Sequence, residues 1–536
     1  MGGRTAGRWW LTGLLMLLPA AGQTQETAPA FWGYGGPNGT RVYADCRPPL
    51  NWDGRTRKNI LWEVPLPSWG HGSPLAVAGK VFVICEPVEG ERDLPLLMCL
   101  DQSTGKVLWQ KELDHTPVLP SDGPAARSAW KEVMAEYALR FRLGNAYLAA
   151  KDDASKQAAL AEMEKVGLTW NARWSKVVHK GTGMYDQPHG MKVAAKAGFS
   201  TETWRHGCSN GSTDCIGFGY ATPVSDGKDL YVCTAWGGFF CFDLEGKQKW
   251  VTYAPGHAGE YCCNARSPIL YKNLLLSDIG NYVRAFDRTS GKLLWSSDGP
   301  WPRGRKNGSH TIVSPMVMTV GGKDILWAAG CTPYLLPEGK LLRVEGWKDE
   351  GMQTLVKYDE PDVIFFCGSG EHCGWTGKGV GEINPPAAVR FRLENDTLKA
   401  TVLWHGGTVA KELGVEPRSI MGGNAPWMLY HRGKFYHTGG IILDVLTGKK
   451  LAGTLRRGGA SPAVPATGHL LCLAGNHVFG LSGETMEVFT VDGQRVASNA
   501  LAKPAAGRFS HGCTFTFAGE RVFIRGLNHL VCVGAR

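Results

Sequence analysis

A short pattern of strands and turns recurs along most of the chain, and this repeat constrains the fold more than any other feature. The clear copies span residues 73–109, 221–250, 267–295 and 461–490, and a last copy reads "GCTFTFAGERVFIRGLNHLVCVG". Weaker copies start at Ser314, near Pro361 and at Ala425. A supersecondary unit repeated in this way indicates a ring or an array rather than a single irregular core.

Each copy has the same order of signals. A small residue and a proline lead into a short apolar strand, and a Gly-Lys-type turn joins this strand to a second one. A third strand ends in Asp, a Thr-Gly-Lys turn follows, and a fourth strand ends in Trp, as in "CLDQSTGKVLW". Four short strands repeated at roughly 30–50 residues describe one propeller blade. The sequence therefore predicts an all-β fold, a closed propeller of about eight four-stranded blades.

The two ends of the chain are predicted to meet in one blade. The last copy lacks a full outer strand after "LVCVG", and "NILWEVPL" at residues 59–66 could supply it. An open ring would leave strand edges exposed, so closure between the N- and C-terminal segments is expected.

Residues 114–205 interrupt the repeat and are predicted to form a helical insertion. Apolar residues recur there at helical spacing, namely Trp130, Val133, Met134, Tyr137, Phe141, Leu160, Met163 and Val166. Two helices joined near residues 151–155 are expected. We favour a hairpin packed on the propeller, and a lid or docking surface is the alternative, because the insertion leaves from the face that carries the central funnel.

The first 22 residues have the pattern of a secretory signal peptide. Arg4 and Arg8 precede the apolar stretch "WWLTGLLMLLPAAG", and small residues offer a cleavage site near Gln23. We expect a periplasmic or secreted protein with an N-terminal extension at residues 23–57 and the propeller at residues 58–536. No other stretch is long and apolar enough to span a membrane.

The net charge of +10 does not indicate a nucleic-acid partner. Part of the charge lies in the predicted leader, and the remaining basic residues are scattered rather than gathered in a stripe.

Polar residues directly before the inner strands are the candidate binding residues, because these positions should surround the funnel. They are His71, Asn264, Arg266, His310, Asn424 and His511. Converging histidines could bind a metal, an anion or a substrate. The same residues could equally cap turns between blades, and Arg266 could be a carboxylate-binding fork or a blade-to-blade ion pair.

The 15 cysteines fall into different environments. Cys99, Cys241 and Cys532 occupy a repeat position that is alanine at Ala285, so we expect buried, reduced thiols there. Two further pairs flank loops and are candidates for local disulfides, namely Cys208 with Cys215 and Cys367 with Cys373.

The blade signature resembles the pyrroloquinoline-quinone (PQQ)-like propeller repeat. The residues that carry the resemblance are "CLDQSTGKVLW" at 99–109, "CFDLEGKQKW" at 241–250 and "AFDRTSGKLLW" at 285–295. The segments "FWGYGGPNGT" and "KNILWEVPLPSWGHGSP" are similar to secreted bacterial members. The resemblance covers most of residues 31–536 apart from the insertion. It implies the fold more than the function, because this fold carries enzymes, assembly factors and binding proteins.

The adjacent residues Cys262 and Cys263 raise the question of catalysis. In quinoprotein dehydrogenases of this fold a vicinal disulfide packs on PQQ, an arginine contacts the quinone, and calcium is held by Glu and Asn near a catalytic Asp. Cys262, Cys263 and Arg266 resemble part of that set. The segment "ILWAAGCTPYLLP" at 325–337 lacks the expected Asn, and the calcium carboxylate and base are not evident.

Two functions follow from these observations. We expect a non-catalytic binding or scaffold protein whose ligand is a protein, a glycan or a small molecule. The alternative is a PQQ- and calcium-dependent dehydrogenase acting on alcohols or sugars. The cysteine pair is either a disulfide platform for a ligand or a reduced pair with one side chain in the blade core.

Overall fold

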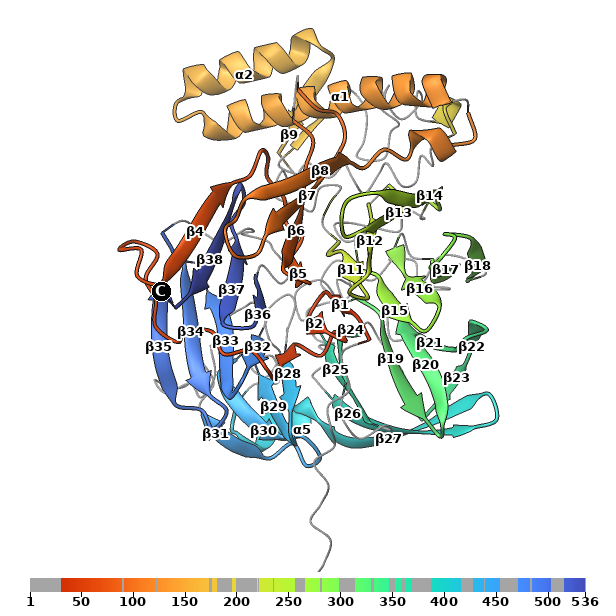
Figure 1. The fold of residues 1–536 in the computed structure, drawn as a ribbon, viewed down its shortest axis with the longest axis vertical. Coiled ribbons are helices and arrows are strands. Elements are labelled where there is room, and N and C mark those ends of the chain that lie inside the picture. The colour runs from red at the N-terminus through yellow and green to blue at the C-terminus, as the bar shows by residue number, and fades with distance from the viewer. Residues whose placement is uncertain are drawn as a thin grey trace, which may run out of the picture.

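Eight β-sheets surround one axis in chain order in the computed structural model, which confirms the all-β propeller (Figure 1). The structure describes residues 30–88, 91–121, 123–172, 176–180, 195–198, 219, 221–234, 236–255, 266–279, 282–297, 314–328, 332–346, 352–357, 363–368, 387–415, 428–437, 439–453, 471–482, 484–502 and 515–535.

Blades 1 to 4 each contain four antiparallel strands, given from the axis outwards. Blade 1 contains β5 (Leu75–Val77), β6 (Lys80–Cys85), β7 (Leu96–Asp101) and β8 (Val107–Glu112). Blade 2 contains β11 (Val224–Ser225), β12 (Asp229–Cys233), β13 (Gly238–Asp243) and β14 (Gln248–Tyr253). Blade 3 contains β15 (Ile269–Tyr271), β16 (Leu274–Ser277), β17 (Arg284–Asp287) and β18 (Leu293–Ser296). Blade 4 contains β19 (Met316–Val320), β20 (Lys323–Ala328), β21 (Thr332–Leu335) and β22 (Lys340–Leu341).

Blades 5 to 8 complete the ring. Blade 5 contains β24 (Met352–Lys357), β25 (Val363–Gly368), β26 (Ala387–Glu394) and β27 (Thr397–His405), with β23 (Arg343–Glu345) added parallel to β27, and α5 (Gly406–Glu412) follows. Blade 6 contains β28 (Leu429–His431), β29 (Lys434–His437), β30 (Ile441–Asp444) and β31 (Lys450–Gly453). Blade 7 contains β32 (Leu471–Ala474), β33 (His477–Ser482), β34 (Thr485–Thr490) and β35 (Arg495–Ala500). Blade 8 contains β36 (Phe515–Ala518), β37 (Arg521–Arg525), β38 (His529–Gly534) and β4 (Ile60–Pro65).

The ring closes as the sequence predicted. Strand β4 pairs antiparallel with β38, and Trp62 lies opposite Cys532. The N-terminal part of the chain therefore supplies the outer strand of the last blade, and the edge of β38 is paired rather than exposed.

Both faces of each blade are buried, so the middle strands are apolar at consecutive positions rather than at alternate ones. In β6, Val81 and Val83 pack toward blade 8, whereas Phe82 and Ile84 pack toward blade 2. Successive side chains of a strand point to opposite faces, which is why both sets must be apolar. The predicted buried thiols Cys99, Cys241 and Cys532 lie in these layers and are free, which confirms that prediction.

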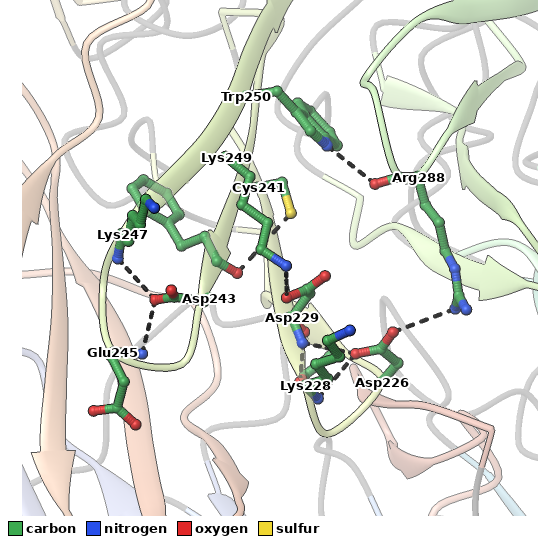
Figure 2. A network of polar contacts seen from close by, with 12 residues as sticks. Asp226, Lys228, Asp229, Cys241, Asp243, Glu245, Lys247, Lys249, Trp250 and Arg288 are labelled. Carbon is green, nitrogen blue, oxygen red and sulfur yellow. Dashed lines mark hydrogen bonds and ion pairs between the residues drawn. The ribbon is translucent and has the colours of Figure 1, made fainter.

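A tryptophan of one blade docks on a glycine turn of the next blade. In Figure 2, Trp250 Nε1 donates to the carbonyl oxygen of Arg288 at 3.0 Å, and Arg288 forms an ion pair with Asp226 at 3.5 Å. A Cβ atom added at Gly291, where φ is +73°, would lie 2.6 Å from the Trp250 ring. The repeat therefore needs glycine at this point both for the left-handed backbone and for the close approach of the indole.

Five of the eight contacts between neighbouring blades, here called seams, use this arrangement. The pairs are Trp62 with Gly105, Trp109 with Gly246, Trp250 with Gly291, Trp295 with Gly339, and Trp404 with Gly448. The described residues at the seams between blades 4 and 5, 6 and 7, and 7 and 8 contain no such pair.

The insertion forms two helices followed by a hairpin, and it lies outside the ring beyond β8 and β14 (Figure 1). A short 3₁₀ turn, η1 (Thr116–Val118), leads to α1 (Gly123–Ala149), α2 (Asp153–Lys165), β9 (Leu168–Asn171) and β10 (Lys176–His179). The predicted helical hairpin is present. Among the described residues, no helix is long and apolar enough to cross a membrane.

Candidate functional site

The candidate site lies at the face where the chain enters each inner strand, here called the funnel face. Of the eight residues predicted for this site, the structure describes His71 and Arg266. The other six lie outside the described residues: Cys262, Cys263, Asn264, His310, Asn424 and His511. Whether the three histidines share one funnel, and whether the adjacent cysteines form a disulfide, stay predictions. The candidate disulfides Cys208–Cys215 and Cys367–Cys373 also involve side chains outside the described part.

Arg266 forms an ion pair with Asp278 inside blade 3. Its Nη1 donates to the carbonyl oxygen of Asp278 at 2.8 Å and lies 3.6 Å from the Asp278 carboxylate. Arg266 is only 3% exposed and Asp278 only 1%. A buried guanidinium needs a countercharge and hydrogen-bond acceptors, and Asp278 supplies both. The ion pair lies within one blade rather than between two.

A thiol lies next to this ion pair. Cys233, at the end of β12, places its Sγ 3.9 Å from the carbonyl oxygen of Arg266. Burial raises the pKa of Cys233 well above its usual value, and the negative charge of Asp278 raises it further. A thiol that stays protonated is a poor nucleophile and a poor metal ligand, so this group acts as packing.

His71 lies in the seam between blades 8 and 1. It is 4% exposed, and its ring packs edge-to-face on Trp69 with the ring centroids 5.5 Å apart. Beside it, Arg525 donates from Nη1 to the carbonyl oxygen of Gly72 at 3.0 Å and from Nη2 to that of Ile84 at 2.6 Å. Arg525 thus joins β37 of blade 8 to blade 1, and burial lowers its pKa. The segment that carries His71 contributes to ring closure.

The small residue before each inner-strand proline also has a structural role. The backbone N–H of Thr222 donates to Ser267 Oγ at 2.8 Å, and the N–H of Ser267 donates to Ser314 Oγ at 3.1 Å. These residues belong to blades 2, 3 and 4, so a chain of hydrogen bonds connects three blades at the funnel face. Repetition of Ser or Thr here is explained by blade-to-blade bonding.

A buried carboxylate at the funnel face was missed in the sequence. Glu86 follows β6, is 1% exposed, and accepts a hydrogen bond from the N–H of Gly219 at 2.8 Å through Oε1. Asp278 follows β16 at the equivalent repeat position, and Thr234 follows β12 there. Alignment of the first residue after each second strand would have shown this acidic position in blades 1 and 3.

The described residues do not fit a calcium–quinone site. Arg266, which the family resemblance would place against the quinone, is buried against Asp278. Within the described ranges, no group of three or more His, Cys, Asp or Glu side chains is placed to hold a metal ion. We therefore derive no reaction step through PQQ or calcium.

The insertion is anchored to the propeller by an aromatic cluster at its base. Trp130 of α1 packs edge-to-face on Trp236 of blade 2, with the ring centroids 5.0 Å apart, and edge-to-face on His115 at 5.1 Å. His115 also stacks on Tyr253 at 5.6 Å. Burial lowers the pKa of His115 to about 4, so its imidazole is neutral at pH 7. The first turns of α1 are therefore fixed to blades 1 and 2.

The outer part of the insertion has a small core of its own. Leu143, Met163, Leu168 and Val177 are buried together, and the residues come from α1, α2, β9 and β10. This unit is packed independently of the blades, and Val166, just past the end of α2, is 45% exposed. The insertion is thus a rigid projection with its own surface.

Comparison with known proteins gives one family match. The family model described as "Outer membrane protein assembly factor BamB" matches residues 192–330. No curated protein sequence matches this chain.

Solved structures show similarity at low sequence identity. BamB from Moraxella catarrhalis is 11% identical over 60% of this chain and 84% of that chain, with a TM-score of 0.36. Quinohemoprotein alcohol dehydrogenase from Comamonas testosteroni is 12% identical over 95% of this chain and 81% of that chain, with a TM-score of 0.44. The Dos1 propeller is 9% identical over 89% of this chain and 95% of that chain, with a TM-score of 0.40.

The blade signature, the eight blades and the family match over residues 192–330 agree with one another. The chain therefore carries the PQQ-like propeller repeat that its sequence indicated.

Proposed function

We propose that this protein is an exported, non-catalytic binding or scaffold protein that acts through its funnel face and its helical insertion. The observation that carries the proposal is the burial of Arg266 against Asp278, at 3.6 Å between charged groups. A quinone-binding arginine must present its donors to the cofactor, whereas this one directs Nη1 to Asp278.

The anchored insertion supports the same function. Its base is held to blades 1 and 2 by Trp130 and by Arg127, which forms a bidentate ion pair with Asp93. Its outer part then presents α2 and the end of α1 to solvent. A rigid projection with its own core is a suitable contact surface for another protein, because little conformational entropy is lost when it binds.

The first experiment separates binding from quinoprotein catalysis. Purified protein is titrated with PQQ in the presence of calcium, and both absorbance and the heat of binding are followed. We expect no stoichiometric binding and no dye-linked oxidation of alcohols or aldoses. Tight binding at one PQQ per chain, together with turnover, would instead establish the dehydrogenase.

The second experiment tests the scaffold function directly. A photo-crosslinking amino acid is introduced at Leu148, which is 54% exposed on α1, and as a control at Leu293, which is 43% exposed on the outer strand of blade 3. We expect a discrete protein adduct from position 148 in cells and none from position 293. Adducts of equal yield from both positions, or from neither, would contradict a docking role for the insertion.

The predicted ligand residues at the funnel face are part of this proposal. Replacement of Cys262 and Cys263 by serine should weaken ligand binding and leave the propeller folded. Mass spectrometry of the exported protein tests whether Cys262 and Cys263 form a disulfide, and we expect the two cysteines to be linked. N-terminal sequencing of that sample tests export, because a processed N-terminus near Gln23 is expected.

A further inference from the structure

The N-terminal segment 31–58 runs through the centre of the ring before it reaches β4. It contains three two-residue strands, β1 (Trp32–Gly33), β2 (Gly36–Pro37) and β3 (Val42–Tyr43). Strand β1 pairs antiparallel with β11, the inner strand of blade 2, and β3 pairs parallel with β32, the inner strand of blade 7. Figure 1 shows β1 and β2 at the centre of the ring. We call residues 31–58 the N-terminal strap.

The strap lies at the face opposite the funnel. Trp32 is opposite Ser225, the last residue of β11, and Tyr43 is opposite Ala474, the last residue of β32. Inner strands enter at the funnel face, so their last residues mark the other face. A Cβ added at Gly227, in the turn after β11, would lie 3.2 Å from the Trp32 ring. The backbone of the strap therefore crosses the axis at this second face.

The strap then binds blades 6, 7 and 8 in succession. A guanidinium nitrogen of Arg41 donates to the carbonyl oxygen of Met428, which precedes β28 of blade 6. The hydroxyl of Tyr43 lies 3.1 Å from Thr516 Oγ1 in β36 of blade 8. Arg41 and Tyr43 are 6% and 4% exposed. Two buried polar side chains of one short N-terminal segment thus contact blades 6 and 8, which lie near the other end of the chain and do not adjoin each other.

Between blades 7 and 8 the strap replaces part of the core. Tyr43, Cys46 and Trp52 of the strap pack in one buried cluster with side chains of both blades. The N–H of Trp52 donates to Asn499 Oδ1 at 3.0 Å. This is one of the three seams that lack a Trp–Gly pair, so the strap supplies packing that a docked tryptophan supplies elsewhere.

The end of the strap also takes the place of the missing turn of blade 8. Asp53 Oδ1 accepts from the N–H groups of Arg55 at 2.7 Å and Thr56 at 3.1 Å. The Asp turn of blade 1 is built in the same way, with Asp101 Oδ1 accepting from the second and third residues after it. A Cβ added at Gly54 would lie 2.5 Å from the backbone nitrogen of Ala502, which follows the last strand of blade 7. This turn therefore docks on blade 7.

We propose that the N-terminal strap is the clamp of the ring. It holds blades 6, 7 and 8 together, it closes the axis at the face opposite the funnel, and its release opens the seam between blades 7 and 8. A ligand then has access to the axis from the funnel face alone. This role is independent of whether the protein binds a partner through its insertion.

Two glycines of the strap provide a matched test in the full-length protein. Gly36 and Gly39 have similar backbones, with φ of +75° and +68°. A methyl group at Gly36 would lie 2.2 Å from the Tyr43 ring, whereas one at Gly39 meets only a carbonyl oxygen at 3.6 Å. Gly36→Ala should therefore displace Tyr43 from blade 8, and Gly39→Ala adds only the backbone strain common to both.

Amide hydrogen exchange reads the result blade by blade. We expect Gly36→Ala to speed exchange in β32 and β36 by about tenfold relative to Gly39→Ala, with β15 and β19 of blades 3 and 4 unchanged. Equal exchange in the two variants would overturn the proposal. Faster exchange spread evenly over all blades would overturn it as well, because the clamp would then not be local to blades 6 to 8.

A cut strap provides a second test that does not depend on a destabilised variant. A site-specific protease sequence is inserted between Thr56 and Arg57, both exposed in the turn before β4. After cleavage, the N-terminal fragment should stay with the propeller in gel filtration and leave it only in denaturant. Immediate loss of the fragment in native buffer would show that the strap does not clamp the ring.

Discussion

Acidification should loosen the base of the insertion through one buried histidine, His115. The ring is 1% exposed between Trp130 and Tyr253, and a Cβ added at Gly238 would lie 3.1 Å from it. Burial lowers the pKa of His115 from 6.5 to about 4, against a smaller opposite effect of the Asp114 carboxylate. Because the ring is buried between aromatic side chains, a proton on it would be poorly solvated, and we expect protonation to open this contact.

The sign and the size of the effect follow from the pKa difference. The folded pKa lies below the unfolded one, so the unfolded chain binds the extra proton as the pH falls below 6.5. The contribution of the neutral His115 ring to the free energy of unfolding is thus present above pH 6.5 and is lost as the pH falls toward 4. The full difference corresponds to roughly 3 kcal/mol, and about 2 kcal/mol is lost between pH 7 and pH 5.

Urea unfolding followed by tryptophan fluorescence measures this loss, since Trp130 and Trp236 lie at the contact. The matched variant is His115→Phe, which keeps an aromatic ring of similar size but cannot be protonated. Between pH 7 and pH 5 the wild type should lose about 2 kcal/mol more unfolding free energy than the variant. The same pH dependence in both proteins would refute the reasoning, because other titrating groups are common to the two.

Two further predictions concern the seams and the ion pair. Gly291→Ala should lower the free energy of unfolding by about 2 kcal/mol more than Gly322→Ala. The methyl group added at Gly291 meets the Trp250 ring, whereas Gly322 has a similar positive φ and no neighbouring atom within 4 Å of the added methyl group. Urea midpoints of the two variants check this, and equal midpoints would contradict the docking role of the turn. Arg266→Met should cost roughly 3–5 kcal/mol, because it leaves the Asp278 carboxylate buried without its cation. The double variant with Asp278→Asn should regain part of that loss in the same assay, and no recovery would argue against the pair as the cause.

The blades could be predicted from the sequence because their signals are local. Asp287 accepts hydrogen bonds from the N–H groups of Thr289 and Ser290, two and three residues further on, and the glycine that follows makes the turn. Such contacts are encoded within a few residues and recur at each copy. The outer strand at residues 59–66 was predicted by the same logic, from a strand pattern at one end and a missing strand at the other.

The strap could not be predicted in this way. Its strands are two residues long, and their partners lie far along the chain, as for Tyr43 and Thr516. Glycines at positive φ replace the alternation of apolar and polar residues that marks a strand, so no period is visible. The segment looked like an extension outside the propeller, and only the assembled ring shows what its side chains contact.

The candidate site could also be predicted only in part from the sequence. The sequence placed Arg266 and His71 before inner strands, and the structure places them there. The partner of Arg266 is Asp278, and the neighbour of His71 is Arg525 of the last blade. Neither partner is indicated by a motif. The role of each residue was therefore left open between ligand binding and blade contact.

The sequence by itself determined the repeat, the number of blades, the closing strand and the helical character of the insertion. Each of these depends on hydrophobic pattern and turn chemistry within about 40 residues of chain. Tertiary structure alone decided that the strap crosses one end of the axis, that α1 is fixed to blade 2 through Trp236, and that Arg266 is neutralised within its blade. The physical reason is that burial and countercharge come from segments brought together by ring closure, and a one-dimensional pattern does not record which segments those are.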